Sequence, residues 1–391
     1  MARRVLILLQ NEPLPHDRHV LNESRALLGA GYEVTVICPR GEGRECAPYE
    51  RFEGIEIHRY EPRPGGERAA GYVVEYLAAL REMRRLARRL ARERPFDIVH
   101  ACSPPDFLLL AALSLRRRGA RFVFDHHDLT PELFRGRYGG GPLAWATLAG
   151  EQVAFRTADV VLSVNDSYRR IAIERGRRDP ADVFVVRTGP DLNSFVPTAP
   201  DESLKRGKPF LLAYVGVMGP QDGVDEALRS LAELAARRCD WRAIFMGDGD
   251  VLGEMRALSA RLGLDDCVEF TGWVEQDTIC RVLSTADVGI APDPKSPLND
   301  LSSMVKISEY MAMSTPFVSF DLSESRVGAG EAALFAPSGD HAGFASLIAE
   351  LLDDPLRRLE MGAAGRRRVL DSLAWEHQER ALLAAYSRAL S

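Results

Sequence analysis

Residues 299–321 read NDLSSMVKISEYMAMSTPFVSFD. The pattern predicts a polar loop, a helix over 303–313, a turn over 314–316 and a buried strand over 317–320. A strand that follows a loop and a helix in this way is typical of parallel α/β sheets, in which the crossover between neighbouring strands is helical. This segment therefore sets the expected fold class.

The start of the predicted helix is a candidate anion site. A helix that begins directly after a loop has unpaired backbone N–H groups and the positive end of its dipole in its first turn. We therefore expect the amides of Ser302, Ser303, Met304 and Val305 to be able to hold a phosphate.

Lys306 and Glu309 follow one helical turn apart. A cation beside a diphosphate and a carboxylate that accepts from a sugar hydroxyl would then lie along one edge. An ordinary amphipathic helix, capped by Ser302 or Ser303 and carrying these two residues as a solvated pair, fits the spacing equally well.

Alternation of apolar strands with helices continues on both sides of this segment, which is the pattern of doubly wound α/β domains. A chain of 391 residues is too long for one core. Residues 196–207, rich in Pro, Ser and charge, are the best linker candidate, and the tail over 356–391 is predicted to be helical with a break near 370–374. The predicted domains are 1–198 and 199–372, followed by a helix over 373–391 that crosses back to the first domain.

Composition excludes several classes of protein. The net charge of −6 argues against general nucleic-acid binding. The six cysteines form no CxxC pair and no Cys/His cluster, so neither a zinc site nor a disulfide framework is expected. The first apolar run is too short for a signal peptide or a membrane span, and we expect a cytoplasmic protein.

Residues 69–93 are predicted to form one long helix with an apolar and a basic face. The apolar positions are Tyr76, Leu80, Met83, Ala87 and Leu90, and the basic ones are Arg81, Arg85, Arg88 and Arg92. Such a face in an acidic protein indicates attraction to anionic lipid headgroups or to an acidic ligand. A solvated arginine-rich helix is the alternative.

The segment DHHDLTPE, residues 125–132, follows a predicted strand directly. Polar residues at the carboxyl end of a parallel strand are site candidates. We expect one of His126 and His127 to face the ligand crevice and the other to pack. A metal site here is only weakly indicated, because no helical HxxxH or distant Cys/His set completes it.

The order of the motifs over nearly the whole chain resembles glycosyltransferase family 4, whose members are retaining enzymes of the GT-B fold. The motifs are DIVH (97–100), DHHDLTPE (125–132), TGPDLNSF (188–195), YVG (214–216), GDGD (247–250), FTGWV (270–274) and the segment from Lys306 to Asp321. The resemblance implies two Rossmann-like domains facing across a cleft, with the acceptor on the first and a nucleotide sugar on the second.

The resemblance also implies roles for individual residues. His127 would reach an outer hydroxyl of the donor sugar, Glu309 would bond the ribose, and the amides near Met304 and Val305 would hold the diphosphate. Further donor-binding positions are Gly219, Gln221, Gly247, Asp248, Phe270, Trp273, Val274 and Ser303. No metal or other cofactor is implied, and retention would arise by same-face attack.

Three departures from the family pattern stand out. The family pairs two glutamates, and Leu301 stands where the first should be, beside Asp300, which could replace it. Val217 and Asp222 occupy the positions of an Arg and a Lys that clamp the diphosphate, and Lys306 is the nearest substitute. The third, Thr188-Gly189 in place of Asn-Gly, is minor.

Asp248-Gly249-Asp250 has the form of the DxD metal motif of the other glycosyltransferase fold. Its place between a strand and a helix favours a glycine-rich turn.

The sequence thus predicts a retaining, metal-independent glycosyltransferase that uses a UDP-sugar, or alternatively a GDP-sugar, and an acceptor that is lipid-linked or a cell-surface polysaccharide precursor. Two alternatives stay open: a sugar-nucleotide epimerase or hydrolase on the same frame, and a non-catalytic nucleotide-sugar-binding subunit, which the absent first glutamate and the two absent clamping cations favour.

Overall fold

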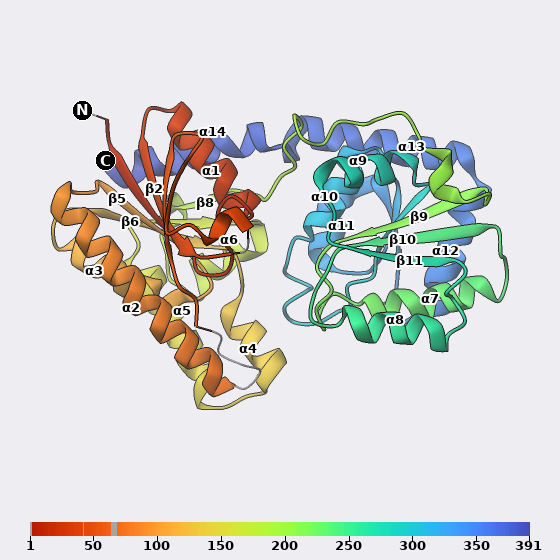
Figure 1. Ribbon diagram of the computed structural model, residues 1–391, viewed down its shortest axis with the longest axis horizontal. Helices are drawn as coiled ribbons and strands as arrows, with labels where there is room; N and C mark the ends of the chain where they lie inside the picture. Colours follow the sequence, from red (N-terminus) through yellow and green to blue (C-terminus); the bar gives the residue numbers. More distant parts are fainter. Residues whose placement is uncertain (1, 42, 64–68) are drawn as a thin grey trace. The chain divides into compact units, whose positions relative to one another are not determined.

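The structure is a computed structural model that describes residues 2–41, 43–63 and 69–391 (Figure 1). It divides into two compact units. Unit 1 comprises Met1–Thr188 and His377–Ser391, and unit 2 comprises Gly189–Glu376. The predicted boundary at 198/199 therefore falls inside unit 2.

Among the described residues of unit 1, eight strands form one sheet in the order β3-β4-β2-β1-β5-β6-β7-β8. All neighbours are parallel except β3 and β4, which form an antiparallel hairpin at the edge. The strands are β1 (Arg4–Leu8), β2 (Glu33–Pro39), β3 (Tyr49–Phe52), β4 (Ile55–Tyr60), β5 (Ile98–Cys102), β6 (Arg121–His126), β7 (Val160–Ser163) and β8 (Val183–Val185).

The helices of unit 1 connect these strands, and the last one returns from unit 2. They are α1 (Arg18–Gly29), α2 (Ala69–Glu93), α3 (Leu109–Arg116), α4 (Thr130–Tyr138), α5 (Pro142–Thr157), α6 (Asp166–Glu174) and α14 (Trp375–Leu390). From His377 on, α14 belongs to unit 1. The predicted break in the C-terminal helical tail is a π-helical turn, Val369–Leu373, between α13 and α14.

In unit 2 the described strands form a six-stranded sheet in the order β11-β10-β9-β12-β13-β14, and every neighbouring pair is parallel. The strands are β9 (Phe210–Val215), β10 (Trp241–Met246), β11 (Val268–Gly272), β12 (Val288–Ala291), β13 (Phe317–Phe320) and β14 (Ala333–Ala336). The helices are α7 (Val224–Ala235), α8 (Leu252–Arg261), α9 (Gln276–Thr285), α10 (Val305–Ala312), α11 (Ser323–Ala329), α12 (His341–Asp353) and α13 (Pro355–Arg368).

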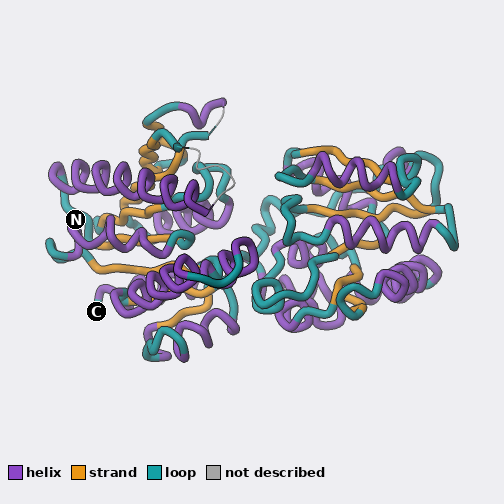
Figure 2. Tube along the Cα trace, turned by 90° about the horizontal axis from the view of Figure 1, so that it is seen from below, coloured by secondary structure: helices purple, strands orange, loops and turns teal. Residues whose placement is uncertain are grey.

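The sheet of unit 2 is buried on both faces because successive side chains of a strand point to opposite sides. In β9, Leu212 and Tyr214 join one buried cluster, whereas Leu211, Ala213 and Val215 join another. Helices lie on both sides of the strands (Figures 1 and 2). This arrangement explains why the strand is a continuous apolar run in the sequence.

Two expectations from the sequence need correction. The β3–β4 hairpin was not predicted, although most residues of β4 alternate between buried and partly buried positions in the manner of a half-buried strand. Residues 196–207 are not a free linker: the backbone N–H groups of Thr198 and Asp201 donate to the hydroxyls of Ser284 and Thr285, at 2.9 Å each. These hydroxyls lie at the end of α9, and the segment includes a short 3₁₀ helix, Glu202–Lys205, within unit 2.

Among the described residues, no helix has both the length and the apolar character that crossing a bilayer requires. The longest one, α2, carries six arginines between Arg81 and Arg92 on its surface-facing sides, which accounts for this result.

Packing of α13 against the end of α10 gives a test of this fold. A methyl group at Gly362 would meet the Ser314 carbonyl oxygen, whereas one at Gly253, on α8, would meet nothing within 4 Å. We expect Gly362→Ala to lower the melting temperature of unit 2 by an amount that corresponds to about 1–3 kcal/mol, because both contacting groups are backbone. Differential scanning calorimetry of the two alanine variants measures this; Gly253→Ala should match or exceed wild type, and equal melting of both variants would contradict the packing.

Candidate functional site

In unit 1 the polar residues gather where β6 ends. The strand continues through Asp125 and His126, two residues further than the sequence predicts. Asp125 is 1% exposed and His126 is fully buried, whereas the side chain of His127 is 17% exposed. The backbone N–H of His127 donates to Ser103 Oγ at 3.0 Å, which fixes the loop just beyond the strand.

The two adjacent histidines divide their roles as expected from the sequence. The His126 ring packs among aromatic rings, with centroids 4.9 Å from Phe155 and 5.2 Å from Tyr168. The His127 imidazole instead turns back to the Asp125 carboxylate, which its Nε2 contacts. His127 is therefore the histidine that reaches the carboxyl edge of the sheet.

Asp125 is the centre of a larger buried cluster. His100 Nε2, on β5, lies 3.1 Å from Asp125 Oδ2, and its Nδ1 lies 2.7 Å from the Tyr386 hydroxyl on α14. His19, on α1, stacks edge-on against His127 with ring centroids 4.3 Å apart, and its Nε2 lies 3.9 Å from Asp125 Oδ2.

Glu23 closes the cluster on the side of α1. Its carboxyl oxygens lie 3.4 Å from His19 Nε2 and 3.7 Å from His100 Nε2. Its side chain has no exposed surface. One carboxylate, three imidazoles and a second carboxyl group thus share a dry site.

Burial and mutual attraction set the charges in this cluster. Burial lowers the pKa of His127, but the Asp125 carboxylate outweighs it and raises that pKa to about 10. Burial would raise the pKa of Asp125, yet the His127 cation holds it well below its usual range. Burial together with the His127 cation lowers the pKa of His19 to about 4, and burial together with Asp125 raises the pKa of Glu23 to about 8. At neutral pH these shifts make His127 a cation and Asp125 an anion, and they favour the neutral forms of His19 and Glu23.

The same cluster has the donor atoms of a metal site. One ligand atom each from His19, Asp125 and His127 lies within 4.8 Å of the other two, and His100, Cys102 and Asp125 form a second such set. These donor types suit zinc or another divalent metal. The expectation that no metal takes part remains a prediction.

In unit 2 the loop before α10 leads into a helix that starts at Val305, two residues later than predicted. The N-cap is Met304, whose side chain accepts no hydrogen bond from the helix, so neither Ser302 nor Ser303 caps it. Ser302 Oγ donates instead to the Leu298 carbonyl, at 2.9 Å. Ser303 and Val305 are exposed, which leaves the first turn of the helix open to a ligand.

Lys306 lies directly behind that first turn. Its Nζ lies 2.6 Å from Asp293 Oδ1, and both side chains are almost fully buried. Burial lowers the pKa of Lys306, but the Asp293 and Asp222 carboxylates outweigh it and raise the pKa. Burial raises the pKa of Asp222, and the Lys306 ammonium opposes that shift. The solvated Lys306–Glu309 pair considered from the sequence is wrong, because Glu309 is also only 9% exposed.

Glycines allow the loops of unit 2 to approach this site closely. Gly216 has φ 146° and Gly247 has φ 137°, both in the region that side chains rarely adopt. A methyl group at Gly247 would meet the Gly216 carbonyl oxygen, and one at Gly216 would lie 3.2 Å from Lys306 Cε. The GDGD segment is a glycine-rich turn, as expected, with Asp248 Oδ1 accepting from the Gly249 N–H at 2.7 Å.

The remaining predicted donor residues lie at the end of β11 or on loops that follow the strands of this sheet. Trp273 is 55% exposed just after β11, whereas Phe270 packs on Phe245 with ring centroids 5.2 Å apart and Val274 is partly buried. Gly219 donates its N–H to Asp222 at 2.9 Å, and the Gln221 carbonyl accepts from Asn299 at 2.9 Å. Trp273 is therefore the aromatic side chain of this group that presents most surface.

Asp300 is already engaged. It accepts from the N–H and the hydroxyl of Ser323, at 2.8 and 3.1 Å, and lies 3.3 Å from Lys295 Nζ. Taking the place of the missing glutamate at Leu301 would require these bonds to break. Its proposed catalytic role stays a prediction that carries this energetic cost.

Sequence reasoning missed four members of these sites: His19, Glu23, His100 and Asp293. His19 and Glu23 are one helical turn apart on α1, a spacing that places them on one face. His100 lies in a strand that is otherwise apolar, and Asp293 is the second residue after β12. A polar residue inside or just after a buried parallel strand was the signal that could have found the last two.

Comparisons with known proteins agree with this architecture. Residues 16–189 match the family described as "Glycosyl transferase 4-like domain", and residues 209–354 match "Glycosyl transferases group 1". A D-inositol 3-phosphate glycosyltransferase of Kineococcus radiotolerans is 27% identical, with 95% of this chain and 90% of that protein covered.

Two solved structures show the same fold. Sucrose-phosphate synthase from Thermosynechococcus elongatus has a TM-score of 0.80 at 18% identity, with 98% of each chain covered. Anabaena HepE in complex with UDP-glucose has a TM-score of 0.72 at 17% identity, with 98% of this chain and 99% of that one covered.

Two Rossmann-like parallel sheets, each with polar residues at its carboxyl edge, define a protein of the GT-B fold. With both domain matches and the relatives above, the chain is a glycosyltransferase of the GT-B superfamily.

The paired charges of Asp125 and His127 predict a large change in one titration. In wild type the Asp125 carboxylate outweighs the effect of burial on His127. Asp125→Asn removes this carboxylate and leaves burial as the main effect, so the pKa of His127 should fall from about 10 to below its ordinary 6.5. Nuclear magnetic resonance of ¹⁵N-histidine-labelled protein over a pH series measures this. Asp166→Asn, which removes an exposed carboxylate paired with Arg187, is the control and should leave the His127 titration in place; a His127 that still titrates near 10 in Asp125→Asn would disprove the pairing.

Proposed function

We propose that this protein is a retaining glycosyltransferase of family 4 that transfers a sugar from a nucleoside diphosphate donor to an acceptor, without a metal ion. The observation that carries the proposal is Lys306, a buried cation directly behind the open first turn of α10. Helix amides and a lysine together form the kind of site that stabilises charge on a leaving diphosphate.

The paired state of Lys306 is compatible with this role. Lys306 keeps its positive charge despite burial because the Asp293 and Asp222 carboxylates raise its pKa. The amides of Met304 and Val305 add their partial positive charge at the place where the diphosphate would bind. Lys306 thereby substitutes for the Arg and Lys that Val217 and Asp222 replace.

For the donor we propose UDP-glucose or another UDP-sugar, with a GDP-sugar as the alternative. Support comes from HepE, whose structure contains UDP-glucose. On unit 2, the exposed Trp273 offers an aromatic surface for the base, and Glu309 would accept from the ribose hydroxyls.

In the mechanism we propose, His127 donates a hydrogen bond to an outer hydroxyl of the donor sugar. Its raised pKa keeps both ring nitrogens protonated at neutral pH, so one N–H remains for the sugar while the other faces Asp125. The diphosphate leaves as the acceptor hydroxyl attacks from the same face and passes its proton to the leaving oxygen. His19, neutral at that pH, adds no second charge.

For the acceptor we propose a lipid-linked sugar or a cell-surface polysaccharide precursor, met at the inner face of a membrane by a cytoplasmic enzyme. Support comes from the exposed arginines Arg81, Arg85, Arg88 and Arg92 on α2, which would attract anionic headgroups. A non-catalytic nucleotide-sugar-binding subunit is the second candidate, favoured by Leu301, Val217 and Asp222. An epimerase or hydrolase is the third.

Turnover of a radiolabelled UDP-sugar with an acceptor panel tests the proposal. We expect His127→Ala and Glu309→Gln each to lose about 10²-fold or more in kcat/KM, because each removes a hydrogen bond to the donor in a water-poor site. Ser308→Ala, on the exposed side of α10, is the matched control and should keep wild-type turnover.

Other outcomes of the same assay separate the candidates. Equal turnover in wild type, His127→Ala and Glu309→Gln would remove those two roles. Donor binding by calorimetry with no transfer to any acceptor favours the binding subunit, and free sugar released without acceptor favours a hydrolase. Loss of turnover in EDTA, restored by zinc, would place a metal in the His19–Asp125–His127 set.

The Lys306–Asp293 pair allows the structural and binding roles of the lysine to be separated. Lys306→Met leaves a buried carboxylate unpaired and should cost about 3–5 kcal/mol of stability. Adding Asp293→Asn removes that charge and should restore most of the melting temperature.

The double variant should still bind UDP about 10- to 100-fold more weakly than wild type, because a charge-assisted hydrogen bond to the diphosphate is lost. Isothermal calorimetry measures this affinity, with Lys295→Met, an exposed lysine of the same unit, as control. Wild-type affinity in the double variant would assign Lys306 a structural role alone.

A further inference from the structure

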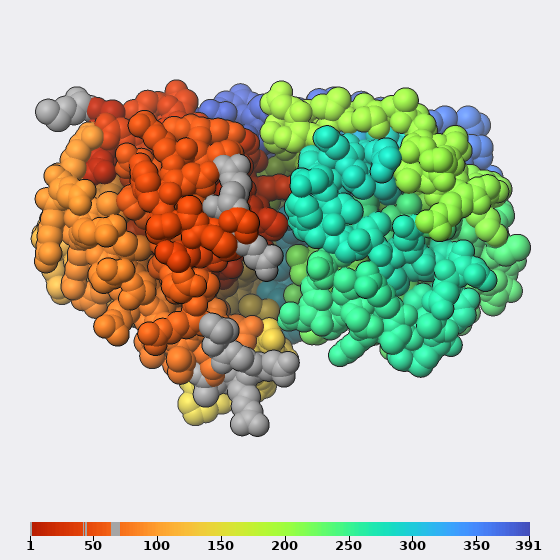
Figure 3. Space-filling model, viewed as in Figure 1, coloured from red at the N-terminus to blue at the C-terminus, as the bar shows by residue number. Residues whose placement is uncertain are grey.

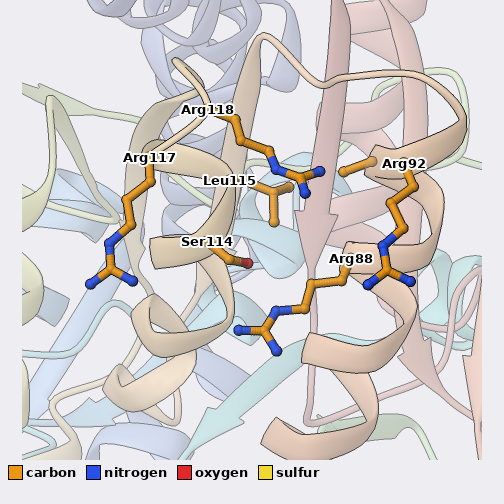
Figure 4. Close-up of a pocket in the computed structure, with 7 residues that line it drawn as sticks. Arg88, Arg92, Ser114, Leu115, Arg117 and Arg118 are labelled. Carbon is orange, nitrogen blue, oxygen red and sulfur yellow. The ribbon is translucent and has the colours of Figure 1, made fainter.

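A basic pocket lies between α2 and α3 of unit 1. Its volume is about 390 Å³, and its lining residues are Arg88, Ala91, Arg92, Ser114, Leu115, Arg117 and Arg118. Figure 4 shows Arg88 extending from α2 toward Ser114 and Arg118 extending toward α2, so the two helices supply opposite walls. Four arginines therefore contribute to the lining of one cavity.

None of these four arginines forms an ion pair with a carboxylate among the described residues. Within the part of the chain that the structure describes, no carboxylate lies within 4.0 Å of the guanidinium of Arg88, Arg92, Arg117 or Arg118. The buried Ser114 Oγ has no hydrogen-bond partner in that same part. Clustered cations repel one another unless an anion compensates them, and guanidinium groups bind phosphate oxygens in a bidentate manner.

The pocket is separate from the site at β6. It is formed by the last turns of α2 and α3, and these helices lead into the first residues of β5 and β6. In a parallel sheet such helix ends lie at the amino edge, opposite the carboxyl edge that carries His127. Arginines in the last turn of a helix also interact favourably with the helix dipole. That interaction stabilises the helix but does not by itself indicate a ligand.

Apolar residues on α2 indicate which anion fits. A shallow groove of about 760 Å³ runs along the same helix from Leu77 and Leu80 to Arg92 and includes Arg81, Arg84, Arg85, Arg88 and Arg89. Leu77 is 61% exposed and Val74 is 59% exposed. Both residues belong to α2, and the sequence region of this helix is orange in Figure 3. Exposed aliphatic side chains followed by arginines suit a lipid surface, where the former enter the acyl boundary and the latter meet phosphates.

We propose that the pocket formed by Arg88, Arg92, Arg117 and Arg118 binds the phosphate of an anionic membrane lipid, while Leu77 and Val74 contact the bilayer. Arg88 and Arg92 on α2, together with Arg117 and Arg118 just after α3, hold one headgroup, with Ser114 as an additional donor. This inference deepens the proposed attachment of the enzyme to a membrane, and it adds Arg117 and Arg118, which the basic stripe of α2 alone does not include.

Flotation with vesicles tests this directly. Full-length wild type should float with phosphatidylglycerol/phosphatidylcholine vesicles and stay behind with phosphatidylcholine alone. Arg117→Gln with Arg118→Gln should bind the anionic vesicles about 30-fold more weakly, because each arginine near an anionic surface contributes about 1 kcal/mol, a factor of about five. Arg88→Gln with Arg92→Gln, on the opposite wall, should give the same loss.

Arg170→Gln with Arg177→Gln is the control. It removes the same two charges from exposed positions on and just after α6, and it should bind within about twofold of wild type. Equal losses for this control and for both pocket variants would overturn the proposal in favour of diffuse attraction. No flotation of wild type would overturn it as well.

A soluble phosphate is the competing ligand for the same pocket. If inorganic phosphate raises the melting temperature of wild type but not of the pocket variants, and wild type does not float, the pocket serves a free anion and the lipid proposal is wrong. UDP-sugar turnover of the pocket variants, measured with a soluble acceptor, should equal that of wild type. If wild type shows no turnover, the proposed enzymatic function is wrong, but the flotation result still decides the lipid proposal.

Discussion

The Asp125 carboxylate is the group on which the architecture of unit 1 depends. It lies in a dry interior, where an unpaired charge is far more costly than at the surface, so partners must come from several elements. His127 comes from the end of the same strand, His100 from β5 and His19 from α1. Tyr386 on α14 joins through His100. One buried charge thereby ties four segments of the chain to the edge of the sheet.

In unit 2 the buried charge is a cation, so carboxylates must compensate it. Lys306 is held by Asp293, at the end of β12, and by the nearby Asp222 in the loop after β9. Both sites therefore place a compensated charge directly behind an open loop at a carboxyl edge. Such pairs add little net stability, but they fix the geometry of groups that a ligand must find in place.

Much of this arrangement could be predicted from the sequence. The strand Phe317–Phe320 has the predicted bounds, because buried parallel strands are short apolar runs between turn residues. The separate roles of His126 and His127 were also predicted.

The partners of those residues could not be predicted. Glu23 is far from His100 in the sequence, and Asp293 lies in a loop that carries no recognisable motif. Only the fold brings Glu23 close to His100 and Asp293 close to Lys306. The linker prediction failed for a related reason. Residues rich in Pro and Ser indicate a solvated segment, but hydroxyls at the end of α9 accept its backbone N–H groups.

The position of α14 in the order of synthesis has a consequence for biogenesis. Residues 377–391 complete unit 1, yet the ribosome makes them after all of unit 2. Until Tyr386 has been synthesised, His100 lacks the hydroxyl that contacts its Nδ1, and Asp125 is its hydrogen-bond partner on the other side. Unit 1 can therefore complete its packing only after unit 2 has been synthesised. During that interval, the incomplete unit 1 is the part of the nascent chain that a chaperone would be expected to bind.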